Sequence, residues 1–355
     1  MIKVVKRPEK KEVTTILGRD VHKIIEKYSD KKKYREYREL WKKASTLEII
    51  PNYPLQIDFE LNYSCNFTCE MCTWSAENTK GRGKSTWFSF EAFKEIIDDG
   101  VTKGLKAIRL NYINEPLIRK DIIKFIKYAK EKGILDIYLS TNGSLLKGNI
   151  AEEIINSGLT RIQVSIDAFT KETFDKIRQG GNFKAVVDNT VNFINLKKKL
   201  SKELPTLRVN FVKTDLNKHE YDDFINFWKD KADCLGVQDL VNIMKPTKSS
   251  KEKKNFNCAQ PFYHLTVRYD GSILPCCTFF AAKLPIAKLS TDKPVSQENN
   301  LHNIDTSELK NQSISDAWNN SLINHLRELH KKGEYYKNSI CNECVLSTSN
   351  IDDEV

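Results

Sequence analysis

The chain has 355 residues, 40% of them hydrophobic, and a formal net charge of +10. This length predicts one large domain with a smaller one, and the apolar content excludes a chain that is mostly disordered. The lysines are scattered and no arginine-rich stripe with interleaved aromatics occurs, so a nucleic-acid partner is not expected, whereas a phosphorylated substrate would suit the basic balance.

The chain contains no apolar run that approaches the ~20 residues of a membrane span, and its first residues lack the apolar core of a signal peptide. We therefore expect a cytoplasmic protein with no membrane partner. Nine cysteines in a reducing compartment predict metal binding or redox chemistry rather than a disulfide framework.

The first segment, residues 1–50, is expected to form a helical extension. Its charged stretch 16–48 has helical spacing, and Pro51 and Pro54 then end the helical pattern. A domain boundary is therefore predicted at residue 50.

Residues 51–245 alternate between strand and helix patterns. Strands are expected over residues 55–61, 106–113, 135–143, 161–167, 207–214 and 235–243. Helices are expected over residues 89–104, 117–133, 149–158, 170–178, 183–200 and 218–232. This alternation predicts an α/β fold with a parallel sheet, either doubly wound or a partial barrel, whose ligands sit at the carboxyl ends of the strands.

Residues 246–355 are expected to form a second, smaller module. Polar residues 245–255 indicate a linker, and the next stretch predicts a hairpin with its turn at Asp270 and Gly271. A helix is expected around residues 313–333, before a final Cys-x2-Cys pair.

Three cysteines, Cys65, Cys69 and Cys72, follow the first predicted strand directly, with the spacing Cys-x3-Cys-x2-Cys. They therefore lie where ligands bind. A closed zinc site wants four ligands, whereas a four-iron cluster held by three thiolates keeps one iron open for a substrate or cofactor. A zinc site completed by a distant residue and three buried core thiols are the alternatives.

This spacing, with Met71 at the apolar position before the last cysteine, resembles the radical S-adenosylmethionine (SAM) superfamily. The resemblance implies a partial (β/α)6 TIM-like barrel and a [4Fe-4S] cluster on Cys65, Cys69 and Cys72 whose open iron binds SAM. It further implies that the reduced cluster splits SAM into a 5′-deoxyadenosyl radical, which abstracts hydrogen from a substrate. A flavodoxin or ferredoxin electron donor is implied as a partner.

Other positions match the family's motifs one by one. Glu115 and Pro116 stand in "YINEPL", where the family usually has Gly-Gly-Glu-Pro, so Ile113 and Asn114 replace the glycines. The stretch "STNG" follows the third strand, "SID" ends the fourth, and an arginine follows in "FDKIRQG". The resemblance implies SAM contacts from Glu115, Ser140, Asn142, Ser165, Asp167 and Arg178.

Among these, Glu115 is expected near the SAM amino group, Ser140 and Asn142 near the ribose or its supporting loop, and Arg178 near the SAM carboxylate. The alternatives are a helix N-terminal charge for Glu115, an ordinary Asn-Gly turn, and a surface helix end for Arg178.

A second cysteine set consists of Cys258, Cys276, Cys341 and Cys344, with Gly271 five residues before Cys276. The pattern resembles the SPASM/twitch extension in its shorter form, which implies one auxiliary [4Fe-4S] cluster. Four cysteines with one Cys-x2-Cys would also suit zinc.

Two further cysteines and two histidines lie outside these two sets. Cys277, next to a presumed ligand, is an alternate ligand, a catalytic hydrogen-atom donor or a buried bystander. Cys234 is expected in the core, and His264 and His302 are expected to be structural or exposed.

The function expected from this resemblance is a radical SAM oxidoreductase or epimerase acting on a small polar substrate, sugar-like or a nucleotide-sugar. The alternative is a maturase that modifies a ribosomal peptide or protein, although residues 1–50 lack the three-stranded pattern of a leader-binding winged helix. A non-catalytic iron–sulfur or zinc scaffold that binds nucleic acid is a third, different class.

Overall fold

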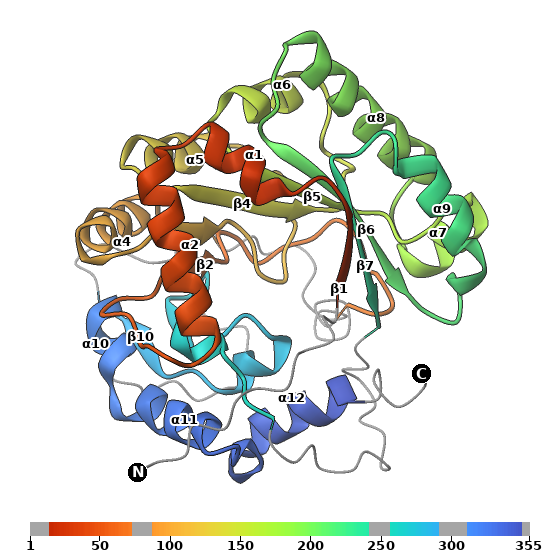
Figure 1. The fold of residues 1–355 in the computed structure, drawn as a ribbon. Coiled ribbons are helices and arrows are strands. Elements are labelled where there is room, and N and C mark those ends of the chain that lie inside the picture. Colours follow the sequence, from red (N-terminus) through yellow and green to blue (C-terminus); the bar gives the residue numbers. More distant parts are fainter. Residues whose placement is uncertain (1–13, 73–86, 241–255, 291–310, 350–355) are drawn as a thin grey trace.

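The computed structural model describes residues 14–72, 87–240, 256–290 and 311–349. Their strands form one mixed sheet in the order β1-β7-β6-β5-β4-β3-β2-β8-β9-β10-β11 (Figure 1). The strands are β1 (Thr14–Gly18), β2 (Gln56–Phe59), β3 (Ala107–Arg109), β4 (Asp136–Thr141), β5 (Arg161–Ser165), β6 (Thr206–Lys213), β7 (Cys234–Asp239), β8 (His264–Val267), β9 (Ser272–Leu274), β10 (Ala287–Leu289) and β11 (Asn311–Gln312).

The predicted α/β class is confirmed. Strands β2 to β7 lie side by side in chain order, and every neighbouring pair among them is parallel. Because this order never reverses, the six strands lack the switch point of a doubly wound sheet, and their topology is that of an incomplete β/α barrel.

Helices connect these strands. They are α4 (Phe90–Lys103), α5 (Ile122–Glu131), α6 (Gly148–Asn156), α7 (Lys171–Ile177), α8 (Phe183–Lys199) and α9 (Tyr221–Trp228). Helix α4 illustrates how the sequence sets their bounds: the Ser89 hydroxyl accepts the Ala92 N–H at its start, and Gly104, at φ 121°, ends it.

The alternation within β2 decides what faces the helices and what faces the barrel interior. Phe59 packs against Phe93 of α4 with ring centroids 4.9 Å apart, and Ile57 belongs to the same apolar core. Asp58 and Glu60 occupy the alternate positions and are fully buried. Because successive side chains of a strand point to opposite faces, the interior of the incomplete barrel is polar.

The N-terminal extension is partly as predicted. Helices α1 (Val21–Lys27) and α2 (Lys31–Ser45) are present and pack on Ala107 and Leu135 through one apolar cluster. Residues 16–18 were expected to be helical, but residues 14–18 form β1, which pairs antiparallel with β7. None of the described helices combines the length and apolar character needed to cross a membrane.

The C-terminal part continues the same sheet. Strand β8 pairs in parallel with β2, and β8 and β9 form the predicted hairpin around Asp270 and Gly271. The helix expected at 313–333 is interrupted: Asn320 ends α10 (Ile314–Asn319) and caps α11 (Ser321–Lys331). Helix α12 (Ser339–Ser349) follows. The domain boundaries at residues 50 and 245 stay predictions, and the expected linker lies outside the described residues.

Candidate functional site

The loop after β2 brings Cys65, Cys69 and Cys72 together. The Phe67 N–H donates to the Cys65 Sγ over 3.4 Å, and the Cys72 N–H donates to the Cys69 carbonyl over 3.0 Å, so the loop folds back on itself. Burial raises the pKa of the Cys65 thiol to about 12; the Phe67 N–H opposes this shift, and Glu115 and the other two thiols add to it. Thiolates here therefore need a cation to be stable.

These residues fit an iron–sulfur cluster. Neighbouring thiols add to the raised pKa values of Cys65 and Cys69, so thiolates here repel one another, and iron ligation removes that repulsion because thiolate is the form that binds iron. A positive charge already lies at the site, since the Arg178 Nη1 is 3.6 Å from the Cys69 Sγ.

The turn after α7 packs against the cysteine loop. The Thr68 N–H donates to the Gln179 carbonyl over 2.8 Å, and the buried Phe67 ring lies against Phe174 with centroids 6.3 Å apart. Gly181 lies so close that a Cβ added there would be 2.6 Å from Phe67 Cζ and 2.8 Å from Phe174 Cε1. Phe67 of the cysteine loop thus packs directly against Gly181, where a larger residue would not fit.

Glu115 follows β3 and is 2% exposed. Its Oε1 accepts the Leu117 N–H over 3.0 Å and the Thr141 hydroxyl over 2.7 Å, and its Oε2 accepts the Asn142 N–H over 2.7 Å. Burial raises the pKa of Glu115 to about 7, while these donors lower it. Glu115 therefore ties the loop after β3 to the end of β4.

Ser140 and Asn142 lie at that end of β4. The half-buried Ser140 donates its N–H to the Asn111 side chain over 2.7 Å. The Asn142 amide donates to Asn66 Oδ1 over 2.9 Å and lies 3.9 Å from the Cys65 Sγ. Asn142 therefore connects its turn to the cysteine loop.

Asp167 and Arg178 form an ion pair beside Cys69. Asp167 is fully buried at φ 59°, a conformation that aspartate tolerates better than most residues, and its Oδ1 accepts the Val212 N–H over 2.7 Å. Its Oδ2 pairs with Arg178. Ser165, the half-buried last residue of β5, precedes this pair. The expected SAM contacts of all these residues stay predictions.

The second cysteine set comes from separate segments. Cys258 precedes β8, Cys276 follows β9, and Cys341 and Cys344 lie on α12. Burial raises the pKa of Cys344 to about 12 and raises those of Cys276 and Cys341 as well, and neighbouring thiols of the set add to each shift. The four thiols are thus gathered, and they fit one four-iron cluster or a zinc ion.

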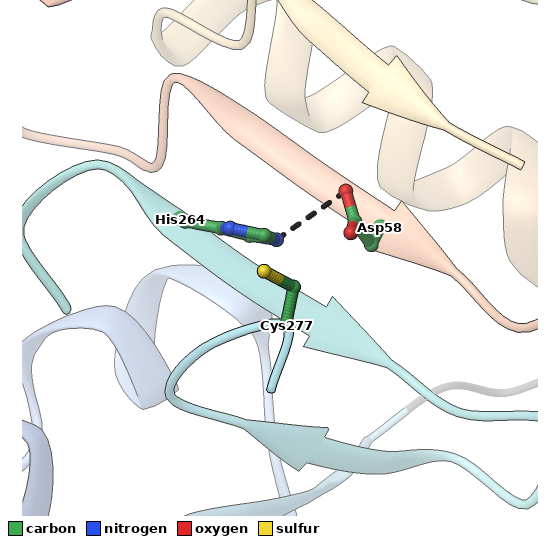
Figure 2. Close-up of side chains that lie close together, drawn as sticks. All are labelled: Asp58, His264 and Cys277. Carbon is green, nitrogen blue, oxygen red and sulfur yellow. Dashed lines mark ion pairs between the residues drawn. The ribbon is translucent and has the colours of Figure 1, made fainter. Parts of the chain in front are cut away.

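Sequence patterns missed a cluster formed by Asp58, His264 and Cys277, from β2, β8 and the segment after β9 (Figure 2). The His264 Nε2 lies 3.3 Å from Asp58 Oδ1, and its Nδ1 lies 2.8 Å from Gln260 Oε1. Burial lowers the pKa of His264, but Asp58 and Cys277 outweigh burial and raise it to about 10. The sequence signal that could have revealed this cluster is Asp58, a polar residue within the buried strand β2.

Cys234 is buried as expected, as the first residue of β7. His302 lies outside the described residues. All nine cysteines are described, and none forms a disulfide.

Arginines from three strands face the barrel interior. Arg161 pairs with Asp136 over 2.6 Å, and Arg109 lies 3.6 Å from Asp58. Arg208 donates to Gln163 and has no carboxylate partner among the described residues. Burial lowers the pKa of Arg208, and Arg161 adds to the lowering. The interior therefore holds a positive charge that favours an anion.

Two family models match the chain. Residues 59–209 match the radical SAM superfamily, and residues 258–345 match an iron–sulfur cluster-binding domain called SPASM. The first range contains the Cys65 triplet, and the second contains all four cysteines of the other set.

Curated relatives match about half of the chain. The chain is 29% identical over 184 residues to a probable GTP 3′,8-cyclase of Methanocaldococcus jannaschii, which is 52% of this chain and 58% of that protein. It is 31% identical over 187 residues to the GTP 3′,8-cyclase of Desulforamulus reducens, 51% of this chain and 55% of that protein. The chain thus spans little more than half the length of these relatives.

Solved structures resemble a larger share of the chain. BtrN in complex with AdoMet and 2-DOIA has a TM-score of 0.50 and 19% identity, over 82% of this chain and 93% of its own. Streptococcus suis SuiB bound to S-adenosylmethionine has a TM-score of 0.53 and 15% identity, over 90% of this chain and 76% of its own. At these identities the likeness shows the fold alone.

Proposed function

The chain belongs to the radical SAM superfamily and carries a C-terminal iron–sulfur cluster-binding domain, and from this premise we propose that it abstracts a hydrogen atom from a small, anionic, polar substrate. A sugar phosphate or a nucleotide-sugar fits this description, and oxidation or epimerisation is the net reaction. When bound, the four-iron cluster and SAM supply the one-electron chemistry that removes the hydrogen atom.

The residues of the site have separate roles in the proposed reaction. Cys65, Cys69 and Cys72 would hold the cluster, and Arg178 beside Cys69 offers a fixed planar cation to a carboxylate such as that of SAM. Asp167 orients Arg178 through its ion pair. Glu115 is a positioning residue, because its carboxylate already accepts backbone and side-chain donors from the neighbouring loop.

The arginine-lined interior is the observation that carries the choice of an anionic substrate. Arg208 is partly buried without a carboxylate partner among the described residues, and Arg109 and Arg161 lie on strands of the same sheet. A buried positive charge without a counter-charge is costly, and a substrate phosphate or carboxylate removes that cost on binding.

The second cysteine set bears on the fate of the substrate radical. An auxiliary cluster on Cys258, Cys276, Cys341 and Cys344 would accept an electron and make the net reaction an oxidation. In an epimerisation a thiol returns a hydrogen atom, and Cys277 is the candidate for that role. A flavodoxin or ferredoxin would supply the electron that starts the reaction.

The test is release of 5′-deoxyadenosine from SAM by anaerobically reconstituted, dithionite-reduced protein. Sugar phosphates, nucleotide-sugars, the matching neutral sugars, peptides and GTP are compared, and stimulation by the anionic sugars alone is expected. Stimulation by neutral sugars or peptides would contradict the proposal, the latter in favour of a peptide maturase. Turnover of GTP would assign the reaction of the curated relatives instead.

A further inference from the structure

We propose that Asp58, His264 and Cys277 form a site for one divalent transition-metal ion, zinc in the first instance, separate from the two cysteine sets. The three side chains converge from β2, β8 and the segment after β9 (Figure 2). One ligand atom from each residue lies within 4.8 Å of the others.

Two of the three residues carry a buried polar atom that has an ion-pair neighbour, Asp58 Oδ1 in one case and Arg109 Nη1 in the other, but makes no hydrogen bond among the described residues. These atoms are the His264 Nε2 and the Asp58 Oδ2, on side chains that are 3% and 0% exposed. A buried polar atom without a partner is costly, and native structures rarely leave one without a water or an ion. Both atoms lie on the cluster, so one ion bound there would satisfy both.

The second nitrogen of His264 is already held. Its Nδ1 lies 2.8 Å from Gln260 Oε1, so an Nδ1–H that donates to this carbonyl leaves the Nε2 lone pair available. Metal-binding histidines typically donate the other ring N–H to a carbonyl or carboxylate, which fixes the ring and its tautomer. Gln260 thus supplies the support that a metal-bound His264 requires.

The ligand set selects among metals. Thiolate, imidazole and carboxylate together suit zinc, and three protein ligands leave a fourth position for water or a substrate oxygen. Ligand atoms about 2.0–2.3 Å from zinc lie at most about 3.8 Å apart; the His264 Nε2 and Asp58 Oδ1 atoms, 3.3 Å apart, already meet this limit, and Cys277 must approach them by at most about 1 Å. Cys277 lies outside the strands, where such a movement is tolerated.

The surrounding charge is compatible with this ion. The Arg109 Nη1 lies 3.6 Å from Asp58 Oδ2, which disfavours any added positive charge. Zinc that displaces one proton from the His264 imidazolium and one from the Cys277 thiol leaves the net charge unchanged. The Gln56 amide donates to Asp58 Oδ1 over 2.6 Å and keeps the carboxylate oriented.

Occupancy of this site has a consequence that rests on the proposed function. A Cys277 thiolate held by zinc has no S–H hydrogen to return to a substrate radical. Metal binding therefore favours oxidation over epimerisation.

The test combines elemental analysis with zinc-edge X-ray absorption. Iron-loaded protein is incubated with one equivalent of Zn²⁺ and desalted. We expect about one zinc per chain with one sulfur and two or three nitrogen or oxygen ligands, beside about eight irons. Less than about 0.2 zinc per chain would overturn the proposal, and so would a shell of sulfur alone, which places zinc on the other cysteines.

Matched variants locate the ion. His264→Gln and Cys277→Ser should lower zinc at least about fivefold with iron unchanged, because each removes one of three ligands. The controls His219→Gln, at an exposed histidine, and Cys234→Ser, at a buried thiol outside the cluster, should retain zinc. Unchanged zinc in the first pair would refute the site. If a variant loses iron as well, the spectrum of the unaltered protein still decides, and none of these readings requires turnover.

Discussion

Replacing Gly181 with alanine tests whether the cysteine loop depends on the space beneath Phe67. The new Cβ would lie 2.6 Å from Phe67 Cζ and 2.8 Å from Phe174 Cε1, closer than real contacts allow. Both rings are buried, so neither can move aside without displacing its neighbours. Phe67 lies between Cys65 and Cys69, and its displacement moves these two proposed iron ligands.

The magnitude follows from two opposing effects. Overpacking a core costs about 1–3 kcal/mol, and alanine restricts the unfolded chain by about 0.4–1 kcal/mol, so Gly181→Ala should destabilise by about 1–2 kcal/mol. Gly181 is absent from the residues with positive φ, so backbone strain does not enter.

The assay is urea unfolding of iron-loaded protein under anaerobic conditions, with iron content measured in parallel. The midpoint should fall, and iron should be lost from the three-cysteine cluster. Phe67→Leu in the same chain makes room for the new methyl group, so the pair should show a coupling energy of about 0.5–3 kcal/mol in a double-mutant cycle. An unchanged or higher midpoint for Gly181→Ala, or no coupling, would refute the packing argument.

Three further predictions concern substrate binding, pH and the second cysteine set. Arg208→Gln should raise the KM for an anionic substrate about 10- to 100-fold with a smaller effect on kcat, because a charged hydrogen bond is worth about 1.5–3 kcal/mol; the exposed Arg35→Gln should leave KM unchanged. Hydrogen bonds from Lys27, Tyr28 and Arg19 lower the pKa of Glu203 to about 2, so this contact stabilises α1 above pH 4.5 and is lost as pH falls through about 2. Glu203→Gln at pH 7 should therefore speed proteolysis near α1. Cys344→Ser should remove about four of eight irons while the three-cysteine cluster keeps its SAM-dependent spectrum.

Each of these has a clear opposite outcome. An unaltered KM in Arg208→Gln would move the anion site elsewhere. Equal cleavage rates for Glu203→Gln and the unaltered protein would mean that the contact contributes nothing measurable, as some surface pairs do. Retention of all iron in Cys344→Ser would remove that residue from the ligand set.

Features that depend on residues close in sequence could be predicted from the sequence alone. The strands expected at 135–143 and 161–167 and the turn at Asp270 and Gly271 each depend on residues close in sequence, and each is found where it was expected. The cysteine triplet could also be predicted from the sequence, because its three thiols lie within eight residues.

Pairings between segments that are distant in sequence could not be predicted from local sequence patterns. The stretch 14–18 becomes a strand because the edge of β7 offers it hydrogen bonds. The helical pattern of residues 313–333 hides a break, because Asn320 provides a cap that competes with the helix backbone. Asp58 and His264 meet only because β2 and β8 are neighbours in the sheet.

The pairing of β2 with β8 also delays completion of the sheet while the chain is synthesised. Gln56 of β2 faces His264 of β8, so about 200 residues must be translated before the edge of β2 finds its partner. At about 5–20 residues per second this takes roughly 10–40 s, during which the edge of β2 presents unpaired backbone groups. Until its last neighbour arrives, the edge of β2 is therefore open to pairing with another chain.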